Sequence, residues 1–383
     1  MHALSLVGRE PCGQLIERPD IAAYDLDHAR TEAQRVLQRV EAFEHGQRRV
    51  AAGPPEAGYQ RPFLHAGDNV SSAVKLEGIH HITAITCDAV GNVEFYTGLL
   101  GLRMVKKSVN QDDPTVYHLF YGDDDGSPGM DLTFFEYPGA ARGAAGAGMV
   151  HRIVWRVASP EALDFWEARL ADAGVSSERS TEQVRDAASL VFSDPEGLEH
   201  EFAVSASEDP PLHATAPGIP AEHALQGFDG ARAYSEDPAN SAALLRDTLG
   251  FDGEDDSRWE VRGEERHGFY VYDPPPQGVT PVQGAGSVHH IAFASQLDEQ
   301  DAWRAHVSEG GAHVTEVIDR FYFRSIYFRE PSGVLFEIAT IGPGFAVDED
   351  ADHLGERLSL PPRFEPLRER LDGVLTPLPY PRQ

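Results

Sequence analysis

Cysteine is scarce in this chain, with only Cys12 and Cys87 among 383 residues. Two cysteines exclude a disulfide framework, and they also exclude a metal cluster built from several thiolates. Any metal ion held by this protein must therefore be bound by histidine and carboxylate side chains.

Basic residues are also few. The chain has 32 Lys and Arg against 62 Asp and Glu, which gives a formal charge of −30, and only Lys75, Lys106 and Lys107 are lysines. Such a charge repels nucleic acid and anionic lipid, so we expect neither as a partner. A halophilic, high-salt cytoplasm would explain the acidic surface, and an acidic surface that binds a partner stays open as the weaker alternative.

Long hydrophobic runs are missing as well. No apolar stretch approaches the roughly 18 residues that a membrane-spanning helix needs, and residues 1–13 lack the basic and apolar regions of an export signal. We therefore expect a cytoplasmic protein. Since single cores stop growing at roughly 250 to 300 residues, more than one domain is expected.

What the chain does contain is a fourfold internal repeat. Each unit opens with a β-rich run, continues with a helical stretch that ends at a glycine, and closes with further alternating segments. The opening runs are 78–86, 149–157, 227–235 and 287–295, and the helical stretches are 93–100, 162–170, 241–249 and 301–307. The pattern predicts an α+β fold of four βαβββ modules.

The predicted modules cover most of the chain. They span 76–143, 148–206, 224–280 and 285–345. We interpret residues 1–75 as an N-terminal extension that is partly helical or disordered, and residues 346–383 as a C-terminal strap.

Two of the four modules carry a His-His pair at the same place. At the second residue of the pair the modules have, in order, His81, Arg152, Gly230 and His290. In modules 1 and 4 the residue before it is also histidine, at His80 and His289, which completes the His-His pair. Because side chains alternate across a strand, only one imidazole of each pair is expected to face a given side. The first and fourth modules thus offer a ligand each.

A glutamate near the end of the last strand completes the pattern. The first, second and fourth modules have Glu136, Glu201 and Glu337 there, and the third has no clear counterpart. Two imidazoles and one carboxylate on one face are the ligand set of non-haem Fe(II) oxygenases. We therefore predict a mononuclear metal site made of His81, His290 and Glu337. Glu136 is either a fourth ligand or a carboxylate with a structural or supporting task.

Taken together, the four modules and the segments 79–83, 288–291 and 335–338 resemble the vicinal-oxygen-chelate superfamily of glyoxalases, bleomycin resistance proteins and dioxygenases. The resemblance covers about residues 76–380 and is best to the hydroquinone-type ring-cleaving dioxygenases. It implies two pseudo-symmetric half-barrel domains, in which modules 1 and 4 pair around the metal and modules 2 and 3 form a metal-free partner.

The resemblance also implies the cofactor and the residues that surround it. Fe(II), with Mn(II) as an alternative, would be held by His81, His290 and Glu337. The neighbouring positions carried over from the family are His80, Thr83, His289, Arg320 and Tyr327.

The expected activity is cleavage of a hydroquinone- or catechol-type ring by O2, as in the degradation of aromatic compounds. His289 or His80 would move the substrate proton, since imidazole titrates near working pH. Tyr327 would hydrogen-bond a ring hydroxyl or an oxygen species. Arg320 would stabilise negative charge or hold Tyr327, with a plain salt bridge to Asp319 or Glu330 as the alternative.

Two other functions stay open at this point. A glyoxalase-type lyase or isomerase would use Ni or Zn with Glu136 as a fourth ligand. A resistance-type protein would bind an aromatic ligand without converting it, and would not need the metal ligands. The ring substituents and the oligomeric state are left open, and a homo-oligomer is one option.

Overall fold

The computed structural model describes residues 74–180 and 188–379. The prediction for residues 1–75 therefore lies almost entirely outside the described residues. No helix of the described part is both long and apolar enough to cross a membrane. Cys87 is disulfide-bonded, and one such bond is not the framework on which a small disulfide-rich domain depends.

Each module has the expected order of one strand, a helical segment and three strands. Modules 1 and 2 comprise β1 (Ile79–Thr86), α2 (Ala89–Val93), the π-helical turn η1 (Glu94–Leu99), β2 (Arg103–Val109), β3 (Tyr117–Gly122) and β4 (Asp131–Glu136), then β5 (Val150–Val157), α3 (Pro160–Asp172), β6 (Ser177–Ser180), β7 (Ser189–Ser193) and β8 (Glu199–Val204). Modules 3 and 4 comprise β9 (Phe228–Tyr234), η3 (Pro238–Ser241), η4 (Leu244–Thr248), β10 (Asp252–Asp255), β11 (Arg258–Arg262) and β12 (His267–Asp273), then β13 (Val288–Ser295), α4 (Gln300–Glu309), β14 (Ile318–Asp319), β15 (Arg324–Arg329) and β16 (Leu335–Thr340).

Local sequence explains where the helices begin and end. The Ser159 hydroxyl caps α3 by accepting a hydrogen bond from the backbone N–H of Ala162, and Pro160 at the first helical position needs no donor partner. Asp88 caps α2 in the same way. Gly101, just after η1, takes a φ of 73°, which glycine adopts without strain.

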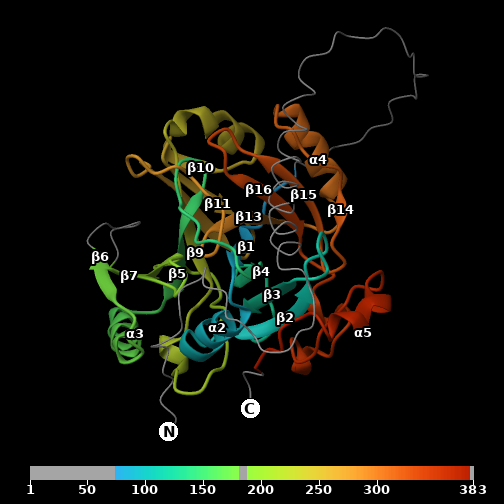
Figure 1. Ribbon diagram of the computed structural model, residues 1–383. Helices are drawn as coiled ribbons and strands as arrows, with labels where there is room; N and C mark the ends of the chain where they lie inside the picture. The colour runs from blue at the N-terminus through green and yellow to red at the C-terminus, as the bar shows by residue number, and fades with distance from the viewer. Residues whose placement is uncertain (1–73, 181–187, 380–383) are drawn as a thin grey trace, which may run out of the picture. The chain divides into compact units, whose positions relative to one another are not determined.

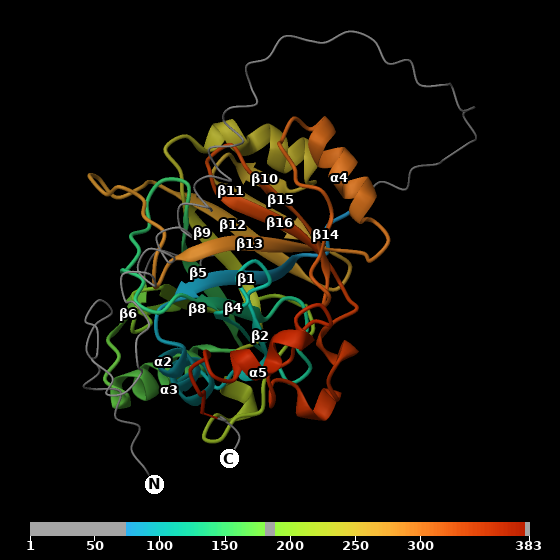
Figure 2. The same cartoon turned by 45° about the vertical axis from the view of Figure 1, so that its right-hand side comes forward.

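The strands form two eight-stranded sheets that confirm the expected module pairing. One sheet has the order β14-β15-β16-β13-β1-β4-β3-β2 and the other the order β10-β11-β12-β9-β5-β8-β7-β6. Modules 1 and 4 thus share one sheet, and modules 2 and 3 share the other. Figures 1 and 2 show β1 and β13 side by side at the centre of the first sheet.

A β-bulge interrupts each of the central strands where the His-His pair lies. In the pairing of β1 with β13, His80 is skipped between Ile79 and His81, and His289 is skipped between His290 and Val288. A bulge inserts an extra residue and re-aims its side chain. Strict alternation therefore does not hold here, and the two imidazoles of each pair come into contact through their Nδ1 atoms.

A small aromatic cluster packs against the first sheet, separate from the main core. It consists of Val105, Phe120, Ala292, Tyr322, Phe323, Ala339, Phe345 and Leu354. Phe345 and Leu354 belong to the C-terminal region, which contains the short helical elements η5 (Phe345–Val347), η6 (Ala351–His353), η7 (Glu365–Leu367) and α5 (Arg368–Leu371). This region therefore closes one side of the module 1 and module 4 sheet.

A buried lysine fixes the C-terminal region to β2. The ammonium group of Lys106 is fully buried, pairs with Asp348 at 2.8 Å and with Glu349, and donates to the backbone carbonyl of Phe345 at 2.9 Å. The backbone N–H of Ser359 donates to the carbonyl of Lys107 at 2.9 Å. A buried charge is tolerated only when it is paired in this way.

Candidate metal centre

Three side chains from three adjacent strands meet at the centre of the first sheet. His81 on β1, His290 on β13 and Glu337 on β16 are all buried. His81 Nε2 lies 3.3 Å from His290 Nε2, and Glu337 Oε2 lies 3.2 Å from the first and 2.8 Å from the second. We call the face that carries them the triad cup. Strand pairing explains the meeting, because Thr83 lies opposite His290 and Ala292 lies beside Glu337.

The spacing of these atoms fits a single metal ion. Two ligand atoms that bind one ion at about 2.1 Å and at right angles lie about 3 Å apart, which matches the three separations. Glu337 Oε2 is buried and lacks a hydrogen-bond donor of acceptable geometry. Three buried lone-pair atoms aimed at one point are a ligand set that a divalent cation satisfies.

The electrostatics of the triad favour a bound cation. Burial alone would raise the pKa of Glu337, but the nearby imidazoles of His81 and His290 hold it well below its usual range. Burial lowers the pKa of His290. A carboxylate that stays ionised although it is buried is what metal binding requires of this ligand.

Hydrogen bonds behind His81 fix the tautomer that metal binding needs. His80 Nε2 donates to the carbonyl of Thr340 at 3.2 Å, which can only accept. Burial, followed by the influence of His81, lowers the pKa of His80 to about 3, so His80 is neutral and its Nδ1 is an acceptor. His81 Nδ1 lies 3.0 Å from that atom and must donate its proton. The free lone pair of His81 is therefore on Nε2, facing the other ligands.

Module 4 repeats this support on the other side. His289 Nδ1 lies 2.8 Å from His290 Nδ1, and burial, with the influence of His290, lowers the pKa of His289 to about 3. The hydroxyl of Ser325 donates to Glu337 Oε1, which leaves Oε2 for the cup. Each ligand is thus oriented by a neighbour, as is usual around metal sites.

Arg320 and Tyr327 lie beside the triad as a pair. Arg320 Nε donates to the Tyr327 hydroxyl at 3.4 Å, and the Tyr327 ring packs 5.8 Å from the His290 ring. Arg320 forms its salt bridge with Asp112 at 3.2 Å, rather than with Asp319 or Glu330 as the alternative held. Burial and the nearby Glu337 raise the pKa of Tyr327, so the phenol stays protonated.

Thr83 belongs to a hydrogen-bonded chain that sequence reasoning did not find. Its hydroxyl lies 2.8 Å from the Thr133 hydroxyl, which in turn lies 3.0 Å from His118 Nε2. Burial, with the influence of His81 and His290, holds the pKa of His118 well below its usual range, so this imidazole is neutral. In the sequence, His118 is only a histidine at the second position of a strand, β3, and such a position does not distinguish a site residue from a surface residue.

Glu136 lies outside the triad. It pairs in register with Thr86, and its carboxylate accepts a hydrogen bond from the backbone N–H of Ala89 at 3.4 Å, at the start of α2. The residue of β4 that is equivalent to Glu337 is Thr133, which lies three residues before Glu136. An odd offset along a strand reverses the side-chain direction, so Glu136 faces the helical layer.

Comparisons with known proteins agree with this geometry. Residues 78–202 and 227–338 match the family model of the glyoxalase/bleomycin resistance protein/dioxygenase superfamily. The chain belongs to this superfamily. A Bacillus subtilis protein described as a candidate ring-cleaving dioxygenase, MhqA, is 38% identical over 325 residues, which cover 80% of this chain and all of that protein.

Two further similar proteins extend the comparison. The chlorohydroquinone/hydroquinone 1,2-dioxygenase of Sphingobium indicum is 31% identical over 320 residues, covering 78% of this chain and 95% of that protein. The crystal structure of a candidate dioxygenase from Bacillus subtilis is 38% identical, with a TM-score of 0.73 over 80% of this chain and 99% of that one.

This member of the superfamily has a second cup in which ion pairs replace the triad. Arg152 holds the position of His81, and its guanidinium pairs with the fully buried Glu201 at 3.2 Å. Arg232 pairs with Asp273 at 2.7 Å, and His151 Nε2 lies 2.9 Å from the same carboxylate. We call this set the ion-pair cup. Its cations are side chains, so its carboxylates are already neutralised.

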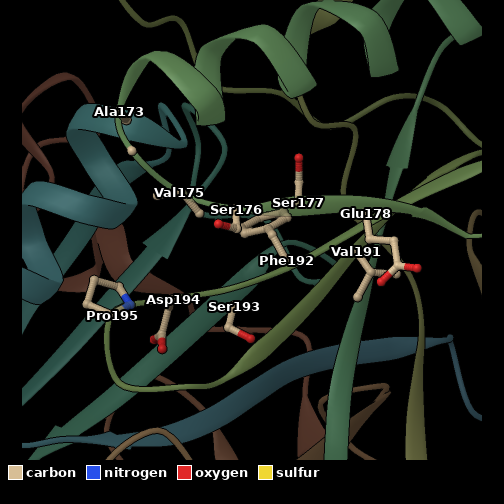
Figure 3. A pocket seen from close by; sticks show the side chains of 11 residues that line it. Ala173, Val175, Ser176, Ser177, Glu178, Val191, Phe192, Ser193, Asp194 and Pro195 are labelled. Carbon is tan, nitrogen blue, oxygen red and sulfur yellow. The ribbon is translucent and has the colours of Figure 1, made fainter.

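An open pocket of 620 Å³ lies elsewhere in this superfamily member, beside the end of α3 and the strands β6 and β7. Figure 3 shows Asp194 and Glu178 among its lining residues. The Asp194 carboxylate already accepts hydrogen bonds from the Tyr96 hydroxyl at 2.9 Å and from two backbone N–H groups. The pocket is therefore distinct from the triad and carries none of its chemistry.

Proposed function

We propose that this protein is a metal-dependent ring-cleaving dioxygenase that uses O2 to open a hydroquinone- or catechol-type diol. The observation that carries the proposal is the buried His81, His290 and Glu337 triad, whose ligand atoms lie 2.8–3.3 Å apart. Two imidazoles and one carboxylate leave part of a metal's coordination sphere open. Support comes from one relative named as a ring-cleaving dioxygenase and from another named as a chlorohydroquinone/hydroquinone 1,2-dioxygenase.

The metal that we propose is Fe(II), with Mn(II) as an alternative. When bound, such an ion supplies a site at which a diol and O2 are brought together and electronically coupled. The protein contributes the ligands, the fixed tautomer of His81 and the hydrogen bond from Ser325 that orients Glu337.

Aromatic side chains around the triad suit a flat ring as the substrate. The Phe323 ring lies 5.2 Å from the His81 ring, and the Phe135 ring lies 5.6 Å from the His289 ring. Phe135 and His289 keep part of their surface accessible. Aromatic pairs at such separations stabilise one another, so a planar diol is expected to bind between them.

Charged and polar groups on the module 4 side act on the substrate oxygens. Arg320 carries a permanent positive charge that favours a phenolate over a phenol. The Tyr327 hydroxyl is held by Arg320 at 3.4 Å and donates to an oxygen of the diol. When His290 binds the metal through Nε2, its Nδ1–H donates to His289 Nδ1, so His289 carries its own proton on Nε2 and donates it in a hydrogen bond to an oxygen of the diol.

The lyase alternative fits the site less well. It needs a fourth ligand on the same face, and Glu136 instead caps α2. A protein that only binds an aromatic ligand would not need three ligand atoms so arranged. The oxygenase therefore uses all the features of the triad cup, whereas each alternative leaves some of them without a task.

Oxygen uptake tests the proposal. Protein loaded anaerobically with Fe(II) is mixed with hydroquinones and catechols, at low and high salt, and O2 and ring absorbance are followed together. One O2 consumed per ring lost is expected, with no uptake by the His81→Ala variant and normal uptake by Arg152→Met, the matched change in the ion-pair cup. Absence of uptake with every diol, in folded and fully metallated protein, would overturn the proposal.

A further inference from the structure

The two halves of the triad cup are related by an internal pseudo-symmetry that assigns a partner to each residue. His81 corresponds to His290, and the strand pairings then make Thr133 the counterpart of Glu337. On β3, His118 lies opposite Phe135, which is two residues beyond Thr133. On β15, Ser325 lies opposite Ala339, which is two residues beyond Glu337. His118 is therefore the counterpart of Ser325.

The counterparts also form the same hydrogen bond. Ser325 donates to Glu337 Oε1 and so orients the carboxylate toward the two imidazoles. His118 Nε2 lies 3.0 Å from the Thr133 hydroxyl, in the equivalent place. A threonine thus stands where a symmetric cup would have a second carboxylate, and a histidine stands where it would have the supporting serine.

The hydrogen-bond capacity of Thr133 allows its hydroxyl to accept from two neighbours and keep its own proton for a third group. A hydroxyl has one donor and two acceptor sites. The Thr133 oxygen lies 2.8 Å from the Thr83 hydroxyl and 3.0 Å from His118 Nε2, and both partners can donate. When they do, the O–H of Thr133 points elsewhere and can donate to an oxygen atom that arrives in the cup.

The surroundings of His118 suit a fixed supporting role. Its ring packs 4.0 Å from the Phe120 ring and 4.4 Å from the Phe135 ring. Thr83 and Thr133 are both fully buried. The chain of three groups is therefore held in place by packing on both sides.

We propose that Thr133, positioned by His118, binds an oxygen atom of the diol on the side of the triad cup that mirrors Glu337. Thr133 is then a substrate-binding residue, and His118 is a positioning residue. The inference rests on the proposed function and deepens it. A neutral donor on this side leaves room for the substrate and favours its ionised oxygen, whereas a carboxylate would occupy that room and repel the oxygen.

The first test removes only the hydroxyl. Thr133→Val is expected to lower kcat/KM for hydroquinone by about 10-fold to 100-fold, the usual effect of one lost hydrogen bond to a charged group. The dissociation constant for Fe(II) should not change, whereas the melting temperature should fall moderately, because the Thr83 hydroxyl and His118 lose a buried hydrogen-bond partner. Thr133→Ser, which keeps the hydroxyl, should retain kcat/KM within about threefold. An unchanged kcat/KM in Thr133→Val would overturn the assignment.

A double variant tests the positioning role of His118. His118→Phe should lower kcat/KM by itself but add no further loss in the Thr133→Val background, because both changes remove the same hydrogen bond. Losses that multiply would show that His118 acts independently and would overturn its role.

A third variant tests the placement of Thr133 without any turnover. Thr133→Glu supplies the missing symmetric carboxylate, so Zn²⁺ should bind the variant at least about tenfold more tightly than the wild type. Unchanged Zn²⁺ affinity would contradict the placement. If the wild type failed to turn over every diol, the proposed function would fall, while this metal titration would still decide where Thr133 points.

Discussion

In the triad cup, β1 places His81 opposite Ala292 of β13, whereas in the ion-pair cup, β5 places Arg152 opposite Arg232 of β9. The pairing registers are equivalent, down to the bulges at the same positions. One cup gathers three lone-pair atoms, and its nearby guanidinium, that of Arg320, pairs with Asp112 rather than with the triad carboxylate. The other supplies two guanidinium groups for the buried Glu201 and the partly buried Asp273, so the same backbone arrangement holds either a set of metal ligands or ion pairs within the chain.

Gly230 shows that the difference is also steric. It is the counterpart of His290, and a Cβ built there would lie 2.5 Å from the carbonyl oxygen of Phe269. A side chain therefore has no space at this position. The ion-pair cup has adapted its backbone packing to the absence of a ligand, besides having lost one.

The largest expected effect is that of removing one ligand from the triad cup. His290→Ala should lose bound metal and reduce oxygen uptake to background, because two ligands hold an ion much more weakly than three. Far-UV circular dichroism should remain that of the wild type. Full activity with a normal metal content would show that the triad is misassigned.

A methyl group at Gly230 should destabilise the protein without affecting the metal. Gly230→Ala is expected to cost about 3 kcal/mol, because the Phe269 backbone has to move. Urea unfolding measures the cost, and metal content provides the control. A loss of unfolding free energy below about 0.5 kcal/mol would contradict this, because it would mean that the backbone of β12 shifts at little cost.

Breaking the central ion pair of the second cup should have a smaller effect. Arg152→Met keeps the length of the side chain but leaves the buried Glu201 with only Arg232, at 3.9 Å. We expect a loss of about 2 kcal/mol, reduced from the full value for a buried pair because Arg152 is 18% exposed. Oxygen uptake should be normal. Loss of metal from this variant would show that the two cups are not independent of one another.

The smallest expected effect depends on pH. Burial raises the pKa of Asp273, but hydrogen bonds from His151 and Arg232 outweigh it and hold that pKa below its usual value. A depressed pKa contributes stability above the unfolded value near 3.8, and this contribution is lost as the pH falls through the folded value. Asp273→Asn should therefore cost about 1 kcal/mol at pH 6, allowing for solvent screening.

Unfolding curves at several pH values check this prediction. The difference between Asp273→Asn and the wild type should shrink below pH 4, because the unfolded wild-type chain then takes up a proton at Asp273 while the folded carboxylate stays ionised. A difference that stays constant down to pH 3 would indicate lost packing rather than lost charge.

The four modules and the grouping of His81, His290 and Glu337 could be predicted because they depend on repeated patterns in the sequence, whereas the pairing of the modules was implied by the resemblance to the superfamily. Prediction from the sequence failed where a shift of one residue in strand pairing changes the direction of a side chain. The bulges at His80 and His289 place the two imidazoles of each pair in contact, and no local sequence pattern predicts these bulges. Glu136 was matched to Glu337 by its place at a strand end, whereas pairing makes Thr133 the counterpart.

Residues that act across strands were the hardest to find. His118 joins the site only through its hydrogen bond to Thr133 on the adjacent strand. The ion-pair cup was foreseen only as a loss of ligands at Arg152 and Gly230. Its network with Glu201 depends on contacts between strands that are far apart in the sequence.

Anomalous diffraction at the iron edge tests the central claim most directly, using crystals grown and soaked with Fe(II) without oxygen. The account predicts one strong peak per chain, about 2.1 Å from His81 Nε2, His290 Nε2 and Glu337 Oε2, and no peak in the ion-pair cup. A peak beside Glu201 or Asp273, or none between the two imidazoles, would contradict it.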